Sequence, residues 1–134
     1  MEIKVSTENG RVPVTVLHID GSVDAATQEE FAARAQEIIR EGARYILLDL
    51  SRTSYISSAG LRALNVIFNN LRSLHPDANL SEEELKKGIA AGTYKSPHLK
   101  MLNPSGEIRK LLNATGFDMY IETFTDMKSA VASF

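Results

Sequence analysis

Residues 45–71 read YILLDLSRTSYISSAGLRALNVIFNNL, and this stretch decides how the rest of the chain must fold. It opens with a nearly unbroken apolar run that ends at Asp49 and Leu50, which is typical of a strand buried on both faces of a sheet. After a polar connection at 51–54, apolar residues recur at helical spacing, namely Leu61, Leu64, Ile67, Phe68 and Leu71. The sequence therefore predicts a central strand followed by a helix with one core-facing side.

The start of this helix is the first candidate functional feature. Ser57 or Ser58 occupies the N-cap, where a hydroxyl accepts a bond from a backbone N–H that has no partner within the helix. Ala59 and Gly60 leave the first turn open, so an anion can approach the positive end of the helix dipole. Two interpretations stay open from these residues alone: the serines only cap the helix, or Ser58 is phosphorylated and the phosphate spoils a partner surface.

The N-terminal part of the chain predicts a β-hairpin. Residues 2–6 alternate between polar and apolar, residues 8–10 (Glu-Asn-Gly) form a turn signal, and residues 12–19 alternate again. Pro13 suits an edge or strand-start position, because proline has no N–H to donate to a ladder. A loop is expected over residues 20–26.

A first helix is expected after this loop. Thr27, with Glu30 three residues later, predicts a capping box, and Gly42 marks the end of the helix. Its expected buried side consists of Phe31, Ala35, Ile38 and Ile39.

The order strand, helix, strand, helix has a consequence for the serines. A right-handed crossover brings the loop 21–26 to the same end of the sheet as Ser57 and Ser58, so Asp24 can neighbour them. Taken alone, Asp24 also reads as an ordinary loop acid or the first residue of an Asx turn. Asp49 lies on the central strand, and we expect it to satisfy nearby backbone groups rather than to act at a site.

Residues 73–97 predict an insertion after the central helix. The residues at 76–79 break that helix, and Ser81 with Glu84 forms a capping box for a short helix that carries Leu85 and Ile89. Two interpretations are open here: a surface excursion tolerated by the domain, or a docking element that tailors partner choice.

The C-terminal part predicts strand, helix, strand and helix. Strand residues 98–102 are followed by a helix from Asn103 and Pro104, with Pro104 at its first position. A last strand is expected over 119–124, and Thr125 or Asp126 caps a closing helix. The fold class is therefore α/β: one domain over residues 1–134, with a mixed four- to five-stranded sheet opened by a β-hairpin, about four helices and an extra helical insertion.

Composition excludes several classes of function. The chain has 134 residues, a formal net charge of −2, 43% hydrophobic residues and no cysteine. It shows no basic stripe for nucleic acid, no apolar run of about 18 residues for a membrane span, and no secretory signal, so a cytoplasmic location is expected. The three histidines, His18, His75 and His98, lack ligand spacing, and neither a metal nor another cofactor is expected.

These motifs together resemble the STAS domain family, especially its stand-alone members, the anti-sigma-factor antagonists. The resemblance is carried by Asp-Leu-Ser at 49–51, by Ser-Ser-Ala-Gly-Leu-Arg-Ala-Leu at 57–64, by Gly-Ser-Val-Asp at 21–24 and by Asn-Pro-Ser at 103–105. It covers the chain except about 73–97. The central motif is fairly specific, and the flanking ones are weak.

The resemblance implies a bacterial, phosphorylation-controlled protein-binding module without catalytic residues of its own. It implies phosphorylation at Ser58 and a partner-binding surface that includes the loop aspartate, with the residues Asp24, Ser57, Ser58, Ala59, Gly60 and Leu61. The implied partners are an anti-sigma factor serine kinase and a phosphatase. The chain departs from the family pattern at two positions, since Ser57 stands where the family has an acid and Ala59 where it has serine or threonine.

Two rival functions stay open. A non-switching STAS scaffold subunit of a transport or signalling assembly would share the fold without phosphorylation. A small hydrolase would use Ser58 as nucleophile with Asp24, Asp49 or a histidine as its base.

Overall fold

The computed structural model describes residues 1–74 and 81–134. In these residues the chain forms a mixed six-stranded sheet made of β1 (Glu2–Asn9), β2 (Pro13–Val23), β3 (Ile46–Asp49), β4 (Thr53–Ile56), β5 (Leu99–Leu102) and β6 (Thr123–Phe124). The strand order is β1-β2-β3-β5-β6, and β4 pairs with the far end of β2. Among the strand pairs of the described residues, only the β1–β2 hairpin is antiparallel, as its tight connection requires.

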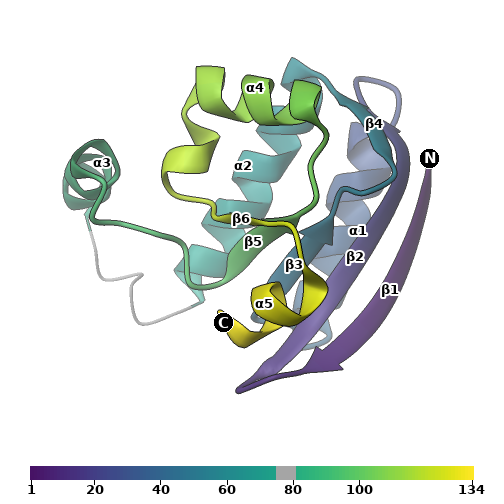
Figure 1. Ribbon diagram of the computed structural model, residues 1–134, viewed down its shortest axis with the longest axis horizontal. Coiled ribbons are helices and arrows are strands. Elements are labelled where there is room, and N and C mark those ends of the chain that lie inside the picture. Colours follow the sequence, from purple (N-terminus) through teal and green to yellow (C-terminus); the bar gives the residue numbers. More distant parts are fainter. Residues whose placement is uncertain (75–80) are drawn as a thin grey trace.

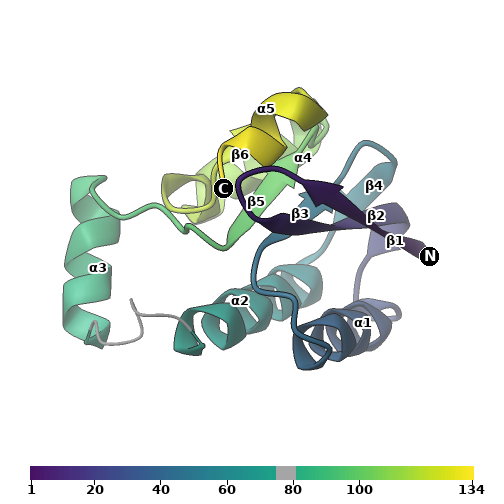
Figure 2. The ribbon, with the colours of Figure 1, turned by 90° about the horizontal axis from the view of Figure 1, so that it is seen from below.

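Helices cover both faces of the sheet. The helical elements are α1 (Gln28–Arg40), α2 (Ser58–Ser73), α3 (Glu82–Ala91), α4 (Gly106–Thr115), the short 3₁₀ helix η2 (Phe117–Met119) and α5 (Met127–Ala132). Figure 1 shows the sheet with these helices around it, and Figure 2 shows α1 and α2 together on one side of the sheet with α5 on the other. The predicted α/β architecture with a hairpin and an added helix is confirmed.

The alternation of β2 separates two cores. Leu17 and Ile19 point to the side of α1 and α2 and belong to the larger buried cluster, which also holds the predicted apolar faces of both helices. Val14 and Val16 point the opposite way and pack with Ala130 of α5 and its neighbours. Because side chains alternate along a strand, His18 and Asp20 continue the α5 side beyond the reach of that short helix.

The prediction of a loop over residues 20–26 is wrong for its first residues. Strand β2 continues to Val23, since Ser22 and Val23 pair in parallel with Tyr55 and Ile56 of β4, after an irregularity at Gly21. No strand is expected from the sequence over residues 53–56, so the end of β2 has no predicted partner there.

The expected capping box of α1 is also wrong. Thr27 is the N-cap residue, but its side chain makes no cap hydrogen bond. Its hydroxyl donates instead to the carbonyl oxygen of Ser22, at 2.8 Å between the oxygens. The threonine therefore ties the helix start to the end of β2.

The start of α4 lies two residues later than expected. Gly106, not Pro104, is the first helical residue, and Ser105 precedes it as the N-cap, with its hydroxyl accepting from the N–H of Ile108 at 3.2 Å. Asn103 has a left-handed backbone with φ of 51°, a conformation that asparagine tolerates better than most residues. The chain thus turns at Asn103 before the helix begins.

The last predicted strand, 119–124, is shorter than expected. Only Thr123 and Phe124 form β6, and the chain before them is taken up by η2 and a turn. The ring of Tyr120 lies 4.9 Å from that of Phe68, centroid to centroid, and Ile121 is fully buried. Tyr120 thus packs against Phe68 of α2 and takes no part in the sheet.

The inserted helix α3 forms as predicted and attaches to α2. Its N-cap Ser81 accepts from the N–H of Glu84 at 3.1 Å, which confirms this capping box. Leu85 is buried, and Arg72 near the end of α2 contacts Glu82 at 3.1 Å. The predicted helix break at 76–79, like His75, lies outside the described residues.

Candidate functional site

The site predicted from the sequence is the beginning of α2. Ser57 is its N-cap, with its hydroxyl accepting from the N–H of Gly60 at 3.2 Å, and this resolves the choice between the two serines as cap. Ser58 is the first helical residue and is exposed. Within the described residues, the Ser58 hydroxyl makes no hydrogen bond, so it is free for a partner or an enzyme.

A close contact with the sheet fixes the position of this helix start. The N–H of Ser57 donates to the carbonyl oxygen of Val23 at 2.9 Å. A Cβ added to Gly60 would lie 2.5 Å from the same carbonyl oxygen, closer than Cβ atoms approach in real structures. Glycine is therefore required at position 60, and the end of β2 and the start of α2 are held together.

This contact places Asp24 beside the serines, as the crossover predicts, because Asp24 directly follows Val23. Its carboxylate also closes an Asx turn: Oδ1 accepts from the N–H of Ala26 at 3.0 Å and from the N–H of Thr27 at 3.2 Å. Asp24 is half-buried. Asp24 therefore has the ordinary loop role and also lies next to the helix start.

The remaining residues of the predicted surface divide by burial. Ala59 is half-buried, whereas Gly60 is buried and Leu61 is 8% exposed and packs in the larger core. Gly60 and Leu61 thus position the helix, and the residues that reach solvent here are Asp24, Ser57, Ser58 and Ala59.

Strand β4 adds to this surface residues that the sequence analysis did not select. Ser54 contacts Ser22 at 3.0 Å between hydroxyl oxygens, and Tyr55 is 55% exposed. The residue types at 53–56, with threonine, tyrosine and isoleucine, favour a strand, and this signal could have identified β4.

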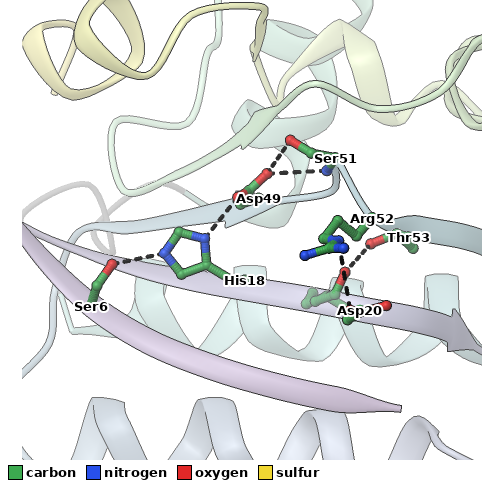
Figure 3. Close-up of polar contacts among 8 residues, drawn as sticks. Ser6, His18, Asp20, Asp49, Ser51, Arg52 and Thr53 are labelled. Carbon is green, nitrogen blue, oxygen red and sulfur yellow. Dashed lines mark hydrogen bonds and ion pairs between the residues drawn. The ribbon is translucent and has the colours of Figure 1, made fainter.

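Asp49 makes hydrogen bonds to side chains as well as the backbone contact expected from the sequence. One carboxylate oxygen accepts from the hydroxyl of Ser51 at 2.5 Å and from its N–H at 3.1 Å, and the other contacts Nδ1 of His18 at 2.7 Å (Figure 3). Burial alone would raise the pKa of Asp49, but the hydrogen bonds from Ser51 and His18 outweigh it and hold this pKa below its ordinary value. Asp49 is thus kept ionised.

The described residues contain neither a metal-ligand cluster nor a membrane-spanning helix. Across residues 1–74 and 81–134, no three histidine, aspartate or glutamate side chains gather where they could hold a metal ion. No helix within the same residues has the length and apolar character needed to span a bilayer.

A known protein of similar sequence supports the family resemblance of the motifs. The chain is 36% identical over 64 residues to BtrV of Bordetella bronchiseptica, which is provisionally named an anti-sigma factor antagonist. This alignment covers 48% of the present chain and 55% of BtrV, so the chain spans about half the length of this curated relative.

Solved structures resemble the whole fold. An anti-sigma factor antagonist from Mycobacterium paratuberculosis aligns with a TM-score of 0.67 at 15% identity, covering 98% of this chain and 93% of its own. The Bacillus cell fate determinant SpoIIAA, in its phosphorylated form, aligns with a TM-score of 0.61 at 18% identity, covering 96% of each chain. At such identities the likeness concerns the fold alone.

The family assignment rests on a direct match. The family model described as the STAS domain matches residues 4–75, which is more than half of the chain and contains both the loop with Asp24 and the start of α2. The chain therefore belongs to the STAS domain family.

Proposed function

We propose that this protein is an anti-sigma-factor antagonist, a protein-binding module that docks onto an anti-sigma factor serine kinase and is switched by phosphorylation of Ser58. The observation that carries the proposal is the exposed Ser58 hydroxyl at the first position of α2, beside the Asp24 loop. This function asks for no catalytic residue in the chain itself. The kinase and the opposing phosphatase are separate proteins, and the expected location is the cytoplasm.

The docking surface would combine rigid backbone with small side chains. Ser57, Ser58 and Ala59 present little bulk, so a partner can approach the first turn of α2 closely. Tyr55, 55% exposed on the adjoining strand, offers the kind of aromatic anchor that often dominates interface energetics. The Gly60 contact with β2 keeps this surface preorganised, which lowers the entropic cost of docking.

Phosphorylation would change this surface by charge and size. A phosphate on Ser58 adds about −1.5 to −2 charges at neutral pH. The helix dipole stabilises that charge in the free protein, while the carboxylate of Asp24 nearby repels it. In a complex, the phosphate would need to be desolvated at the centre of the interface, and binding should weaken.

The neutral cap at Ser57 makes this switch differ from the family pattern. An acid at the N-cap would place a charge directly before the phosphorylated serine, whereas the Ser57 hydroxyl carries none. A kinase that recognises this chain would therefore read a neutral position before Ser58.

Phosphorylation mapping tests the proposal. The purified chain is incubated with ATP and the anti-sigma factor serine kinase from the same organism, and the modified residue is located by mass spectrometry. We expect stoichiometric phosphate on Ser58, none in Ser58→Ala, and unchanged modification in Ser73→Ala, an exposed serine at the other end of α2. An unmodified Ser58 would overturn the switch and favour a non-switching scaffold.

A further inference from the structure

A second polar site lies on the face of the sheet opposite α1 and α2. Helix α5 covers only part of this face, and beyond it the β1–β2–β3 region carries a cleft of about 380 Å³. The cleft is lined by Glu2, Lys4, His18, Ile19, Asp20, Asp49 and Arg52. It is separate from the Ser58 surface and takes no part in the docking proposed above.

The strand register brings three chemically complementary side chains together; His18 and Asp49 line this cleft, and Ser6 lies beside it, bonded to His18. His18 of β2 stands opposite Lys4 of β1 and beside Asp49 of β3. Ser6 is two residues from Lys4 and so lies on the same face of β1. Three adjacent strands therefore supply Ser6, His18 and Asp49 on a rigid support, which holds side chains more firmly than loops do.

Figure 3 shows these side chains linked in one chain of hydrogen bonds. Ser6 Oγ lies 2.8 Å from Nε2 of His18, and Nδ1 of His18 lies 2.7 Å from Oδ2 of Asp49. Both distances are within the range required between a nucleophile and its base and between that base and its orienting group. Each ring nitrogen also faces the partner that a serine, histidine and aspartate triad requires.

The ionised state of Asp49 determines the direction of these hydrogen bonds. A carboxylate only accepts, so Nδ1 of a neutral His18 carries the hydrogen and donates to Asp49. Nε2 is then left with its lone pair and accepts from the hydroxyl of Ser6. The two bonds from Ser51 fix the other oxygen of Asp49, so the orienting carboxylate is itself held in place.

Solvent can reach this arrangement. The side chain of His18 is 33% exposed and that of Asp49 is 17% exposed, while Ser6 is half-buried on the edge strand. Lys4, on the same face as Ser6, carries a side chain that is 76% exposed and so retains freedom to move toward a developing negative charge. The base and nucleophile are thus accessible to a small molecule, although the carboxylate is mostly shielded.

We infer that Ser6 is a nucleophile activated by His18 and Asp49. Small carboxylic esters acylate Ser6, and the acyl group is then hydrolysed. Ser6 Oγ bonds to the ester carbonyl carbon while its proton passes to Nε2 of His18. The bond from the carbonyl carbon to the alkoxy oxygen breaks, and His18 returns the proton to the leaving alcohol. Water then attacks the acyl-serine with His18 again as base, which releases the carboxylic acid and restores Ser6.

This inference differs from the hydrolase considered from the sequence, which placed the nucleophile at Ser58. Ser58 makes no hydrogen bond to a base within the described residues, whereas Ser6 does. The same network also joins three strands, so a purely structural role predicts identical contacts but no special reactivity. The experiment must therefore measure the reactivity of Ser6 rather than stability.

Active-site labelling of the full chain provides this measurement. The parent is treated with a fluorophosphonate ester, and the rates of modification at Ser6 and at the exposed Ser58 are followed in the same sample by peptide mass spectrometry. We expect Ser6 to react at least about 100-fold faster than Ser58, the lower end of the effect of a positioned general base. Equal rates at the two serines would overturn the inference without any variant.

Variants and a second substrate test whether His18 and Asp49 cause the reactivity of Ser6. His18→Gln and Asp49→Asn should each slow labelling of Ser6 at least about tenfold, and hydrolysis of p-nitrophenyl acetate should fall with Ser6→Ala but not with Ser73→Ala. In His18→Ala, added imidazole should restore part of the labelling, as expected if the missing imidazole acts as the base. Labelling of Ser6 that persists unchanged in His18→Gln would contradict the proposed base.

Discussion

Ser6 and Ser58 are both accessible serines of one small domain, yet their surroundings differ in nearly every respect. Ser58 begins α2, is exposed, and makes no side-chain hydrogen bond among the described residues. Ser6 lies on an edge strand across the sheet and is bonded to a histidine that is itself oriented by a carboxylate. Under the proposed functions, Ser58 depends on another protein for its modification, whereas Ser6 has its own base.

The comparison shows that the neighbours of a serine, rather than its exposure alone, determine its chemistry. At Ser58 the helix dipole and the tight contact beneath Gly60 prepare a surface for charge and docking. At Ser6 the sheet register brings His18 within reach of Ser6 and Asp49, as the proposed proton transfer requires. Substitutions that disturb one site should leave the other intact, because Ser6 lies within β1 and Ser58 begins α2.

The largest effect on stability is expected from Gly60→Ala, which disturbs the contact that positions the Ser58 site. The added Cβ would meet the Val23 carbonyl at 2.5 Å, and this overpacking against backbone should lower the free energy of unfolding by about 3 kcal/mol. Denaturant unfolding measures it. Partner docking should weaken as the start of α2 shifts.

Gly106→Ala is the matched control, because Gly106 also begins a helix and a Cβ there meets nothing within 4 Å. It should leave stability unchanged or raise it by up to about 1 kcal/mol. If both alanine variants unfold at the same denaturant concentration, the tight contact below Gly60 is not what fixes α2.

Asp49→Asn tests the network at Ser6. Loss of the charged acceptor should lower the free energy of unfolding near neutral pH by about 1.5 kcal/mol. The folded pKa of Asp49 is lowered, so its charge stabilises the fold fully above the ordinary value of 3.8. That stabilisation is lost as the pH falls through the lower folded value.

The stability difference between parent and Asp49→Asn should therefore be constant at neutral pH and shrink below about pH 4. Urea unfolding at a series of pH values measures this. A difference that stays the same down to about pH 2 would show that ionisation of Asp49 contributes nothing.

Ser57→Ala should have a smaller effect on stability than Asp49→Asn, and its comparison with Ser58→Ala separates the two adjacent serines. Removing the cap hydroxyl leaves the N–H of Gly60 without its acceptor, at a cost of about 1 kcal/mol. Ser58→Ala removes no such bond and should change stability by less than about 0.5 kcal/mol. Thermal unfolding of both variants checks this, and equal losses would assign Ser58 a capping role.

The sequence was sufficient for the features that depend on local pattern. Apolar spacing identified the buried sides of α1 and α2, and the turn residues identified the hairpin. The crossover rule placed the loop of Asp24 next to the helix start, which the bond between Ser57 and Val23 confirms. Each of these follows from rules that act along the chain or on neighbouring elements.

Features that depend on long-range pairing were missed. The strand β4 exists because the end of β2 offers it a ladder, and the same pairing extends β2 through the predicted loop. The link between His18 and Asp49 joins residues 31 apart in the chain, and its formation requires the exact register of β2 and β3. Its spacing from Val14 and Val16 does predict which face of β2 His18 lies on, but no local rule predicts its partner.

The account depends most on the claim that charge at Ser58 controls docking, and binding of a chain with phosphoserine incorporated at position 58 tests it most directly. Its affinity for the anti-sigma factor serine kinase is compared with that of the unmodified chain by titration calorimetry, with melting temperatures as a check on folding. We predict at least about tenfold weaker binding, or 1.4 kcal/mol, at an unchanged melting temperature. Equal affinity of the two chains would contradict the account.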